Sequence, residues 1–225
     1  EGLDWAELTE EERNRIIDSC LDQVSADYGN TVLKSSARNE YMIERTRHIL
    51  RRTVWALQEQ LKHGAFRPEG FEVRFQGGRI DRVDIMEEPE NNRVYVKVID
   101  YKTGNTSFDL LALYHGLQLQ LMVYLDGALQ VEKRKYPDRE IVPAGVFYYN
   151  VKDPMIQEKI HADMESINEQ MLKKMKMNGL VQADDNMSTK IDSTMASIPV
   201  SLNRDGSFSK RSSVASRKQF DVLGA

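Results

Sequence analysis

Two charged residues near the end of an apolar segment are spaced so that they could act together. In "VKVIDYKTG", residues 96–104, Asp100 and Lys102 stand two positions apart. The segment alternates like a β-strand, and side chains two apart on a strand share a face. The same face carries Val94, Val96 and Val98. The sequence therefore predicts a carboxylate and an ammonium group at the end of a buried apolar face.

A second carboxylate is predicted on the neighbouring strand. In "RIDRVDI" the alternation places Asp81 among apolar side chains, while Arg82 and Asp84 share the other face and are expected to form a supporting pair. Two carboxylates on adjacent strands would repel one another, and one would tend to hold a proton. A divalent cation between Asp81 and Asp100 removes this repulsion, and hard oxygen ligands favour Mg²⁺ or Mn²⁺.

Such a site suits hydrolysis of a phosphodiester. A bound metal ion polarises a phosphoryl oxygen and lowers the pKa of an attacking water. A neighbouring lysine can orient that water and stabilise charge that develops on the phosphate. The alternative is a buried Asp100–Lys102 ion pair without a catalytic role, but side chains two apart on a strand project in parallel, and this alternative leaves Asp81 unexplained.

The elements around these residues predict an α/β layered domain. Two helices come first, one opened by a capping box of Thr9 and Glu12 and one stopped by Gly64. A long helical segment, interrupted near Gly116, separates the third strand from the fourth, so the sheet should be mixed, with about four strands flanked by helices. The expected strands are 71–75, 79–87, 93–104 and 140–151, and the expected later helices are 108–136, 156–179 and 212–223.

The same pattern suggests three regions. Residues 1–64 would be N-terminal helices that pack on the core, residues 65–179 the core, and residues 180–225 a polar loop and a C-terminal helix leading out of the fragment. Pro143 suggests that the fourth strand starts there or lies at a sheet edge.

Composition excludes several classes of protein. The chain has no run of about 18 apolar residues, which indicates no membrane span. A single cysteine, Cys20, forms no internal disulfide, is expected to be a buried helical thiol, and suits a reducing, cytoplasmic location. The acidic first residues indicate no signal peptide, and the missing initiator Met indicates a piece of a larger protein.

Charge leaves one question open. The net charge of −4 argues against a generally basic nucleic-acid-binding protein, yet it allows a local basic groove. The second helix carries arginines at Arg38, Arg45, Arg47, Arg51 and Arg52. They form either a solvated face paired with Glu40 and Glu44, or a stripe that contacts phosphates or a partner.

Taken together, "GGRIDRVDI", "YVKVIDYKTG" and "GLQLQLMVYLDGAL" resemble the PD-(D/E)xK nucleases of RecB type. In particular, nearly the whole chain is similar to the C-terminal nuclease domain of the AddB family, one of the subunits of the bacterial ATP-dependent helicase–nuclease. The resemblance implies a restriction-endonuclease-like core and a Mg²⁺-dependent deoxyribonuclease, with Mn²⁺ able to substitute. It also implies action on single-stranded DNA during helicase-coupled processing of double-strand ends for recombinational repair, beside an AddA-like partner.

The resemblance also implies roles for individual residues. The aspartate of the G-x-I-D motif falls on Asp81, and the D-Y-K motif places a second metal ligand on Asp100 and the catalytic lysine on Lys102. The backbone carbonyl of Tyr101 would be a further ligand. The Q-x-x-x-Y motif of the family matches Gln120 and Tyr124, which would help to hold the active site and the DNA strand; alternatively, Tyr124 is a core residue with its hydroxyl satisfied. Arg45 and Arg52 are the candidate DNA contacts.

Two family features are missing from the sequence. A histidine ligand common in these nucleases would lie upstream of "GLDW", and without it the fragment could be inactive; His48, His63, His115 and His161 match no such motif. The four cysteines of the AddB iron–sulfur cluster are also missing, so no cluster is expected here. The rival interpretation is a catalytically silent domain that clamps DNA or braces a helicase–nuclease partner, although such a domain would have no reason to keep the buried charges.

Overall fold

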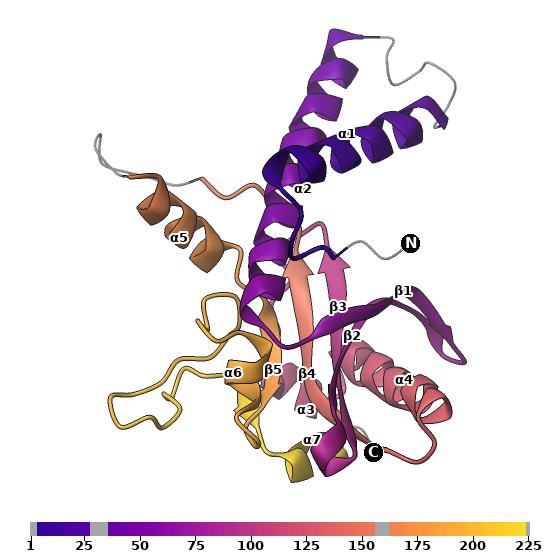
Figure 1. Cartoon of the computed structure of the whole chain (residues 1–225), viewed down its shortest axis with the longest axis vertical. Helices are drawn as coiled ribbons and strands as arrows, with labels where there is room; N and C mark the ends of the chain where they lie inside the picture. The colour runs from indigo at the N-terminus through magenta and orange to yellow at the C-terminus, as the bar shows by residue number, and fades with distance from the viewer. Residues whose placement is uncertain (1–3, 28–35, 156–162, 224–225) are drawn as a thin grey trace.

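The fold is built on one six-stranded mixed sheet with the strand order β1-β2-β3-β4-β5-β6. The structure is a computed structural model, which describes residues 4–27, 36–155 and 163–223. The strands are β1 (Arg67–Phe75), β2 (Gly78–Glu88), β3 (Arg93–Lys102), β4 (Glu140–Asn150), β5 (Asn178–Gln182) and β6 (Val214–Ala215). Figure 1 shows β3 and β4 pointing the same way in the middle of the molecule.

The pairing confirms the expected mixed sheet. Strands β1, β2 and β3 are antiparallel, and β3 and β4 are parallel, joined by a helical crossover. The sheet has six strands where the sequence predicted about four. β6 has only two residues, too few for an alternation to show, and the first two residues of β5 were assigned to the helix expected over 156–179. That prediction was wrong at its end, because the helix ends at Lys174 and β5 pairs with β4, where Gly179 lies against the backbone of Val146; the predicted start lies outside the described residues. The region boundary expected after residue 179 therefore falls inside β5.

Helices cover both faces of the sheet. On one face α2 (Ala37–His63), α5 (Met164–Lys174) and α6 (Met187–Ile191) contribute to a core with Tyr95, Ile99 and Phe147. On the other face α3 (Leu110–Tyr114), α4 (Gln120–Lys135) and α7 (Arg217–Leu223) pack against the valines of β3. A short 3-10 turn, η2 (Pro89–Asn91), links β2 to β3.

The first helix begins, and the second ends, where the sequence predicts. Helix α1 (Glu10–Asp27) opens with the reciprocal bonds of the capping box, in which the backbone amide of Glu12 donates to Thr9 Oγ1 and that of Thr9 donates to Glu12 Oε2. Gly64 closes α2, and Ser36 caps its start. The predicted end of the first helix, near residue 28, lies outside the described residues.

The predicted interruption near Gly116 separates α3 from α4. Asp109 caps α3 by accepting from the amides of Leu111 and Ala112, and Gly116 adopts a positive φ of 72° that ends the helix. Helix α4 then starts at Gln120 and packs mainly against β4 and β3. The helix start is thereby brought to the carboxyl end of β3.

Two further sequence predictions were wrong. Pro143 lies neither at a strand start nor at a sheet edge, because β4 is internal; the proline sits where the β3–β4 register shifts, and a bulge tolerates its missing N–H. Cys20 is exposed, because α1 packs on α2 through a narrow stripe and Cys20 lies outside it. In the described ranges no helix is long and apolar enough to cross a membrane.

Candidate active site

Asp100 and Lys102 lie together where β3 ends. Lys102 Nζ is 2.7 Å from Asp100 Oδ2, and Asp100 is only 3% exposed, whereas the Lys102 side chain is 26% exposed. Both face the α4 side of the sheet, because they continue the row of valines that packs against that helix. The apolar row thus ends in a buried acid with a half-buried cation at its rim.

Asp81 meets β3 at the same point. The β2–β3 ladder runs as far as Arg82 opposite Ile99, and one residue further Asp81 Oδ2 accepts a 2.8 Å hydrogen bond from the backbone amide of Tyr101. The Asp81 carboxylate therefore accepts the hydrogen bond that a backbone carbonyl of β2 would accept if the β2–β3 ladder continued. Because the N–H and C=O of one strand residue point to the same side, the Tyr101 carbonyl also faces Asp81.

The first turn of α4 adds Gln120 and Tyr124 to this cluster. Lys102 Nζ donates to Gln120 Oε1 at 2.9 Å, and Gln120 Nε2 donates to the Tyr124 hydroxyl at 2.9 Å and, more weakly, to Asp100 Oδ1 at 3.4 Å. The four-residue spacing places both side chains on one face of the helix. Tyr124 is therefore bound to the cluster through its hydroxyl while its ring packs edge-on against Phe75, 5.9 Å between centroids.

Sequence reasoning missed one neighbour of the cluster. Lys102 Nζ lies 5.3 Å from the centre of the Tyr148 ring, a cation–π distance. Tyr148 pairs with Asp100 across the parallel β3–β4 ladder. Only that pairing identifies it, since nothing in the local sequence of β4 distinguishes Tyr148 from Tyr149.

The charges of the cluster are unevenly balanced. Burial raises the pKa of Asp100; Lys102 opposes this shift, and the negative charge of Asp81 adds to it. Burial by itself would lower the pKa of Lys102, but contact with Asp100 outweighs burial and the pKa is raised, so the lysine stays cationic at neutral pH. The cluster thus holds two carboxylates and one ammonium group, which pairs with Asp100 only, so it carries excess negative charge.

Asp100 is the more buried of the two carboxylates. Its Oδ2 atom contacts only Lys102 Nζ, at 2.7 Å, and its Oδ1 atom accepts only the weak bond from Gln120 among the described residues. Asp81, Asp100 and the Tyr101 carbonyl are hard oxygen donors that fit a divalent cation. In the described parts of the chain no third His, Cys, Asp or Glu side chain joins Asp81 and Asp100 to form a metal-binding group. The candidate metal ligands are therefore these two carboxylates and one backbone carbonyl.

A second charged cluster lies on the opposite face of the same strands. Arg82 donates to both carboxylate oxygens of Asp84, at 2.5 and 2.8 Å, and Lys97 Nζ lies 2.9 Å from Asp84. The predicted Arg82–Asp84 pair is therefore observed, and Lys97 joins it. Burial would raise the pKa of Asp84, yet the two cations lower it below its usual value. Arg82 Nη1 also donates to the Tyr101 hydroxyl at 3.4 Å, which connects the two clusters through one residue.

The arginine face of α2 has more than one role. Arg47 and Arg51 form ion pairs with Asp18, and Arg47 also pairs with Asp22, so these two arginines hold α1 on α2. Arg52 pairs with Asp153, just beyond β4. Arg45 is exposed. His115, which matches no histidine-ligand motif, is exposed and stacks edge-on against Tyr114.

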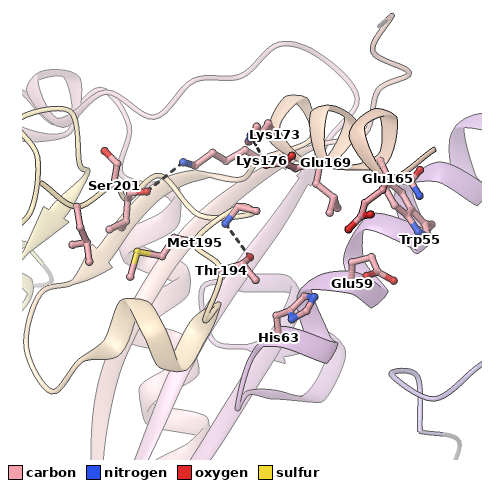
Figure 2. Close-up of a pocket in the computed structure, with 15 residues that line it drawn as sticks. Trp55, Glu59, His63, Glu165, Glu169, Lys173, Lys176, Thr194, Met195 and Ser201 are labelled. Atoms are coloured by element: carbon pink, nitrogen blue, oxygen red, sulfur yellow. Dashed lines mark hydrogen bonds and ion pairs between the residues drawn. The ribbon is translucent and has the colours of Figure 1, made fainter. Parts of the chain in front are cut away.

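A wide groove lies away from these residues. Figure 2 shows this groove, of about 1220 Å³, between α2, α5 and the loop 194–202. Trp55, Glu59 and His63 line it from one side, and none of the predicted site residues contributes to it. The carboxylates and the lysine, rather than the size of a cavity, therefore identify the candidate site.

Comparison with known proteins places the chain in a family. A model of the PD-(D/E)XK nuclease superfamily matches residues 3–213. The chain is 41% identical over 242 residues to an ATP-dependent helicase/deoxyribonuclease subunit of Lachnoclostridium phytofermentans, covering 98% of this chain and 20% of that protein. It is 35% identical over 249 residues to a protein of the same name from Alkaliphilus metalliredigens, covering 99% and 21%.

The chain thus spans about a fifth of the length of the curated relatives it matches. The superfamily match extends over nearly the whole chain and includes every residue of the cluster at the end of β3. The chain therefore belongs to the PD-(D/E)XK nuclease superfamily.

Proposed function

We propose that this chain is a metal-dependent deoxyribonuclease domain that hydrolyses phosphodiester bonds of single-stranded DNA. Membership of the nuclease superfamily and the word deoxyribonuclease in the relatives' names support this proposal. The observation that carries it is the cluster itself: Asp81, Asp100, Lys102 and Gln120 come from β2, β3 and α4 and meet at one strand end.

Asp81, Asp100 and the Tyr101 carbonyl would hold a Mg²⁺ ion, with Mn²⁺ able to replace it. A bound divalent cation supplies polarisation of a phosphoryl oxygen and a lowered pKa for an attacking water. The excess negative charge supports this assignment, because a cation would remove the repulsion between the two carboxylates.

Lys102 would act on the phosphate directly. Lys102 stays protonated and is more exposed than its partner Asp100. Its ammonium can therefore stabilise the charge that develops on a phosphate at the rim of the site. Gln120 would keep the ammonium in place through its carbonyl oxygen, and Tyr124 would fix the amide of Gln120. Gln120 and Tyr124 are thus proposed as positioning residues.

Arg45 and Arg52 are proposed as phosphate contacts for the DNA strand. Arg52 would have to exchange Asp153 for a phosphate, which exposed ion pairs can do at little cost. The arginines that hold α1 on α2 are excluded from this role, because their guanidinium groups are already engaged by Asp18 and Asp22.

The relatives' names support a wider proposal. The domain would act beside an AddA-like helicase partner in the cytoplasm, trimming DNA ends that the helicase unwinds. The rival role, a silent domain that clamps DNA, predicts binding without cleavage.

The test is cleavage of linear single-stranded DNA with Mn²⁺ or Mg²⁺ by the unchanged chain, by Lys102→Ala and by a control, Lys218→Ala, whose exposed lysine lies on α7 far along the chain. Loss of an electrostatic stabiliser lowers such rates by about 10²–10³-fold, so Lys102→Ala should be almost inactive, Lys218→Ala unaffected, and EDTA should abolish cleavage by all three. Equal cleavage by Lys102→Ala would contradict the assignment. Binding of DNA without cleavage by any of them would favour the silent clamp.

A further inference from the structure

The segment 110–123, between β3 and the middle of α4, exposes six large apolar side chains. Each is 45% to 79% exposed. We call these residues the apolar ledge: Leu110, Leu111, Tyr114, Leu117, Leu119 and Val123. Fourteen large apolar residues are exposed in the described ranges, and six of them fall in this one stretch. Single exposed apolar side chains are ordinary, but a cluster of this kind marks a surface that is covered in use.

The ledge is presented by ordered structure. Leu110, Leu111 and Tyr114 are exposed on α3, while Leu113 is buried in the core and fixes the helix there. The connection to α4 is tied down by Gln118, whose side chain donates to a backbone carbonyl and accepts from the amide of Asp109. The apolar side chains are therefore held outward by the fold.

The ledge also adjoins the candidate active site. Leu119 and Val123 are neighbours of Gln120 on the exposed face of α4. Gln120 in turn contacts Lys102 and Asp100. Whatever covers the ledge would form a wall beside the approach to these residues.

Charge decides the chemical class of the partner. From Thr103 to Glu132 the sequence contains no lysine and no arginine. Nucleic acid binding draws most of its affinity from cations placed against phosphates, and this stretch supplies none. Exposed leucine and valine side chains instead match an apolar protein surface.

The length of the relatives points to the source of that surface. About four-fifths of each relative lies outside the part that this chain matches. We propose that the apolar ledge is an internal docking surface, covered by an uncharged apolar face of another part of the same polypeptide in a full-length protein of that size. This docking proposal does not depend on nuclease activity, so it can fail while the proposed function stands, and the reverse.

The test is the rate at which a thiol on the ledge reacts with a maleimide. Leu117→Cys and Leu111→Cys are made singly in a Cys20→Ser background, because Cys20 is itself exposed, and Tyr41→Cys on α2 is the matched control. Each variant is prepared in the 225-residue chain and in the full-length protein. Docking should slow labelling of both ledge cysteines by about tenfold or more in the full-length protein, with less change at Tyr41→Cys.

Two ledge positions are used because a single substitution could itself weaken docking. Leu111 lies on α3 and Leu117 lies in the connection to α4, so the two substitutions change different parts of the ledge. Equal labelling rates in the short and full-length proteins at both positions would overturn the proposal. Slower labelling of the short chain as its own concentration rises would assign the ledge to a second copy. Protection that appears only with a single-stranded oligonucleotide would assign it to nucleic acid, and both of these results would also overturn the proposal.

Discussion

Strands β2 and β3 carry a cluster of charges on each face, and the two clusters differ in one decisive way. On the face away from α4, Asp84 is bound by both Arg82 and Lys97, and all three are at most 3% exposed. On the α4 face, Lys102 pairs with Asp100 and its side chain is 26% exposed, while Asp81 accepts a hydrogen bond from the backbone amide of Tyr101. The first cluster has one acid and two bases, and the second has two acids and one base.

This difference separates a structural network from a chemical site. The first, which we call the sealed cluster, satisfies both carboxylate oxygens of Asp84, and its three side chains are at most 3% exposed. The second, which we call the open cluster, has more acids than bases and keeps a partly exposed cation at its rim. An open cluster with excess negative charge can accept a cation, while a buried cluster with excess positive charge holds the strands together.

The largest expected effect is on the stability of the sealed cluster. Asp84→Ala leaves two buried cations without their partner, which should lower the free energy of unfolding by about 3–5 kcal/mol. Asp81→Ala, the matched change on the same strand, removes a single hydrogen bond and should cost about 1 kcal/mol. Urea denaturation measures both, and similar losses would remove the distinction between the clusters.

A divalent cation should stabilise only the open cluster. Mn²⁺ at about 100 times its Kd should add about 2.7 kcal/mol to the unfolding free energy of the unchanged chain. An Asp81→Asn/Asp100→Asn double variant should show no such gain, because both charged ligands are gone. Thermal melting with and without Mn²⁺ gives the comparison, and equal gains in the two proteins would place the ion elsewhere.

The two buried acids should respond to pH in opposite directions. The pKa of Asp100 is raised above its ordinary value of 3.8, so its contribution to stability is present at low pH and is lost as pH rises through the raised value. The pKa of Asp84 is lowered, so its contribution is present above 3.8 and is lost as pH falls through the lowered value.

Asp100→Asn tests the first of these directions. In EDTA the variant should gain stability relative to the unchanged chain as pH rises from about the ordinary carboxylate value toward neutrality, since the amide carries no charge to bury. Melting temperatures of both proteins across that range measure the difference. A difference that stays constant with pH would show that Asp100 does not titrate in this window.

The smallest expected effect is at the edge of the open cluster. Tyr124→Phe removes the hydroxyl that accepts from Gln120 Nε2 and keeps the ring contact with Phe75. Loss of one such bond is worth about 0.5–1.5 kcal/mol, so cleavage should fall by at most about tenfold. A rate as low as that of Lys102→Ala would assign Tyr124 a direct part in the reaction.

Sequence alone determined the local features, because each depends on residues close together in the chain. The spacing of Asp100 and Lys102 placed both on one face of a strand, and the capping box and Gly64 set helix ends that the structure confirms. The family could also be inferred from the motifs, and the superfamily match confirms it. The roles of the individual site residues stay predictions.

Tertiary structure decided everything that depends on pairing between distant segments. Only the β3–β4 register places Tyr148 beside Asp100, and only the antiparallel β2–β3 pairing brings Lys97 to Asp84. The two residues of β6 are too few for a periodic pattern, and the backbone bonds of β5 and β6 are completed by strands that the local sequence does not contain. The exposure of Cys20 and the internal position of Pro143 likewise follow from what packs around them, which a local pattern does not contain.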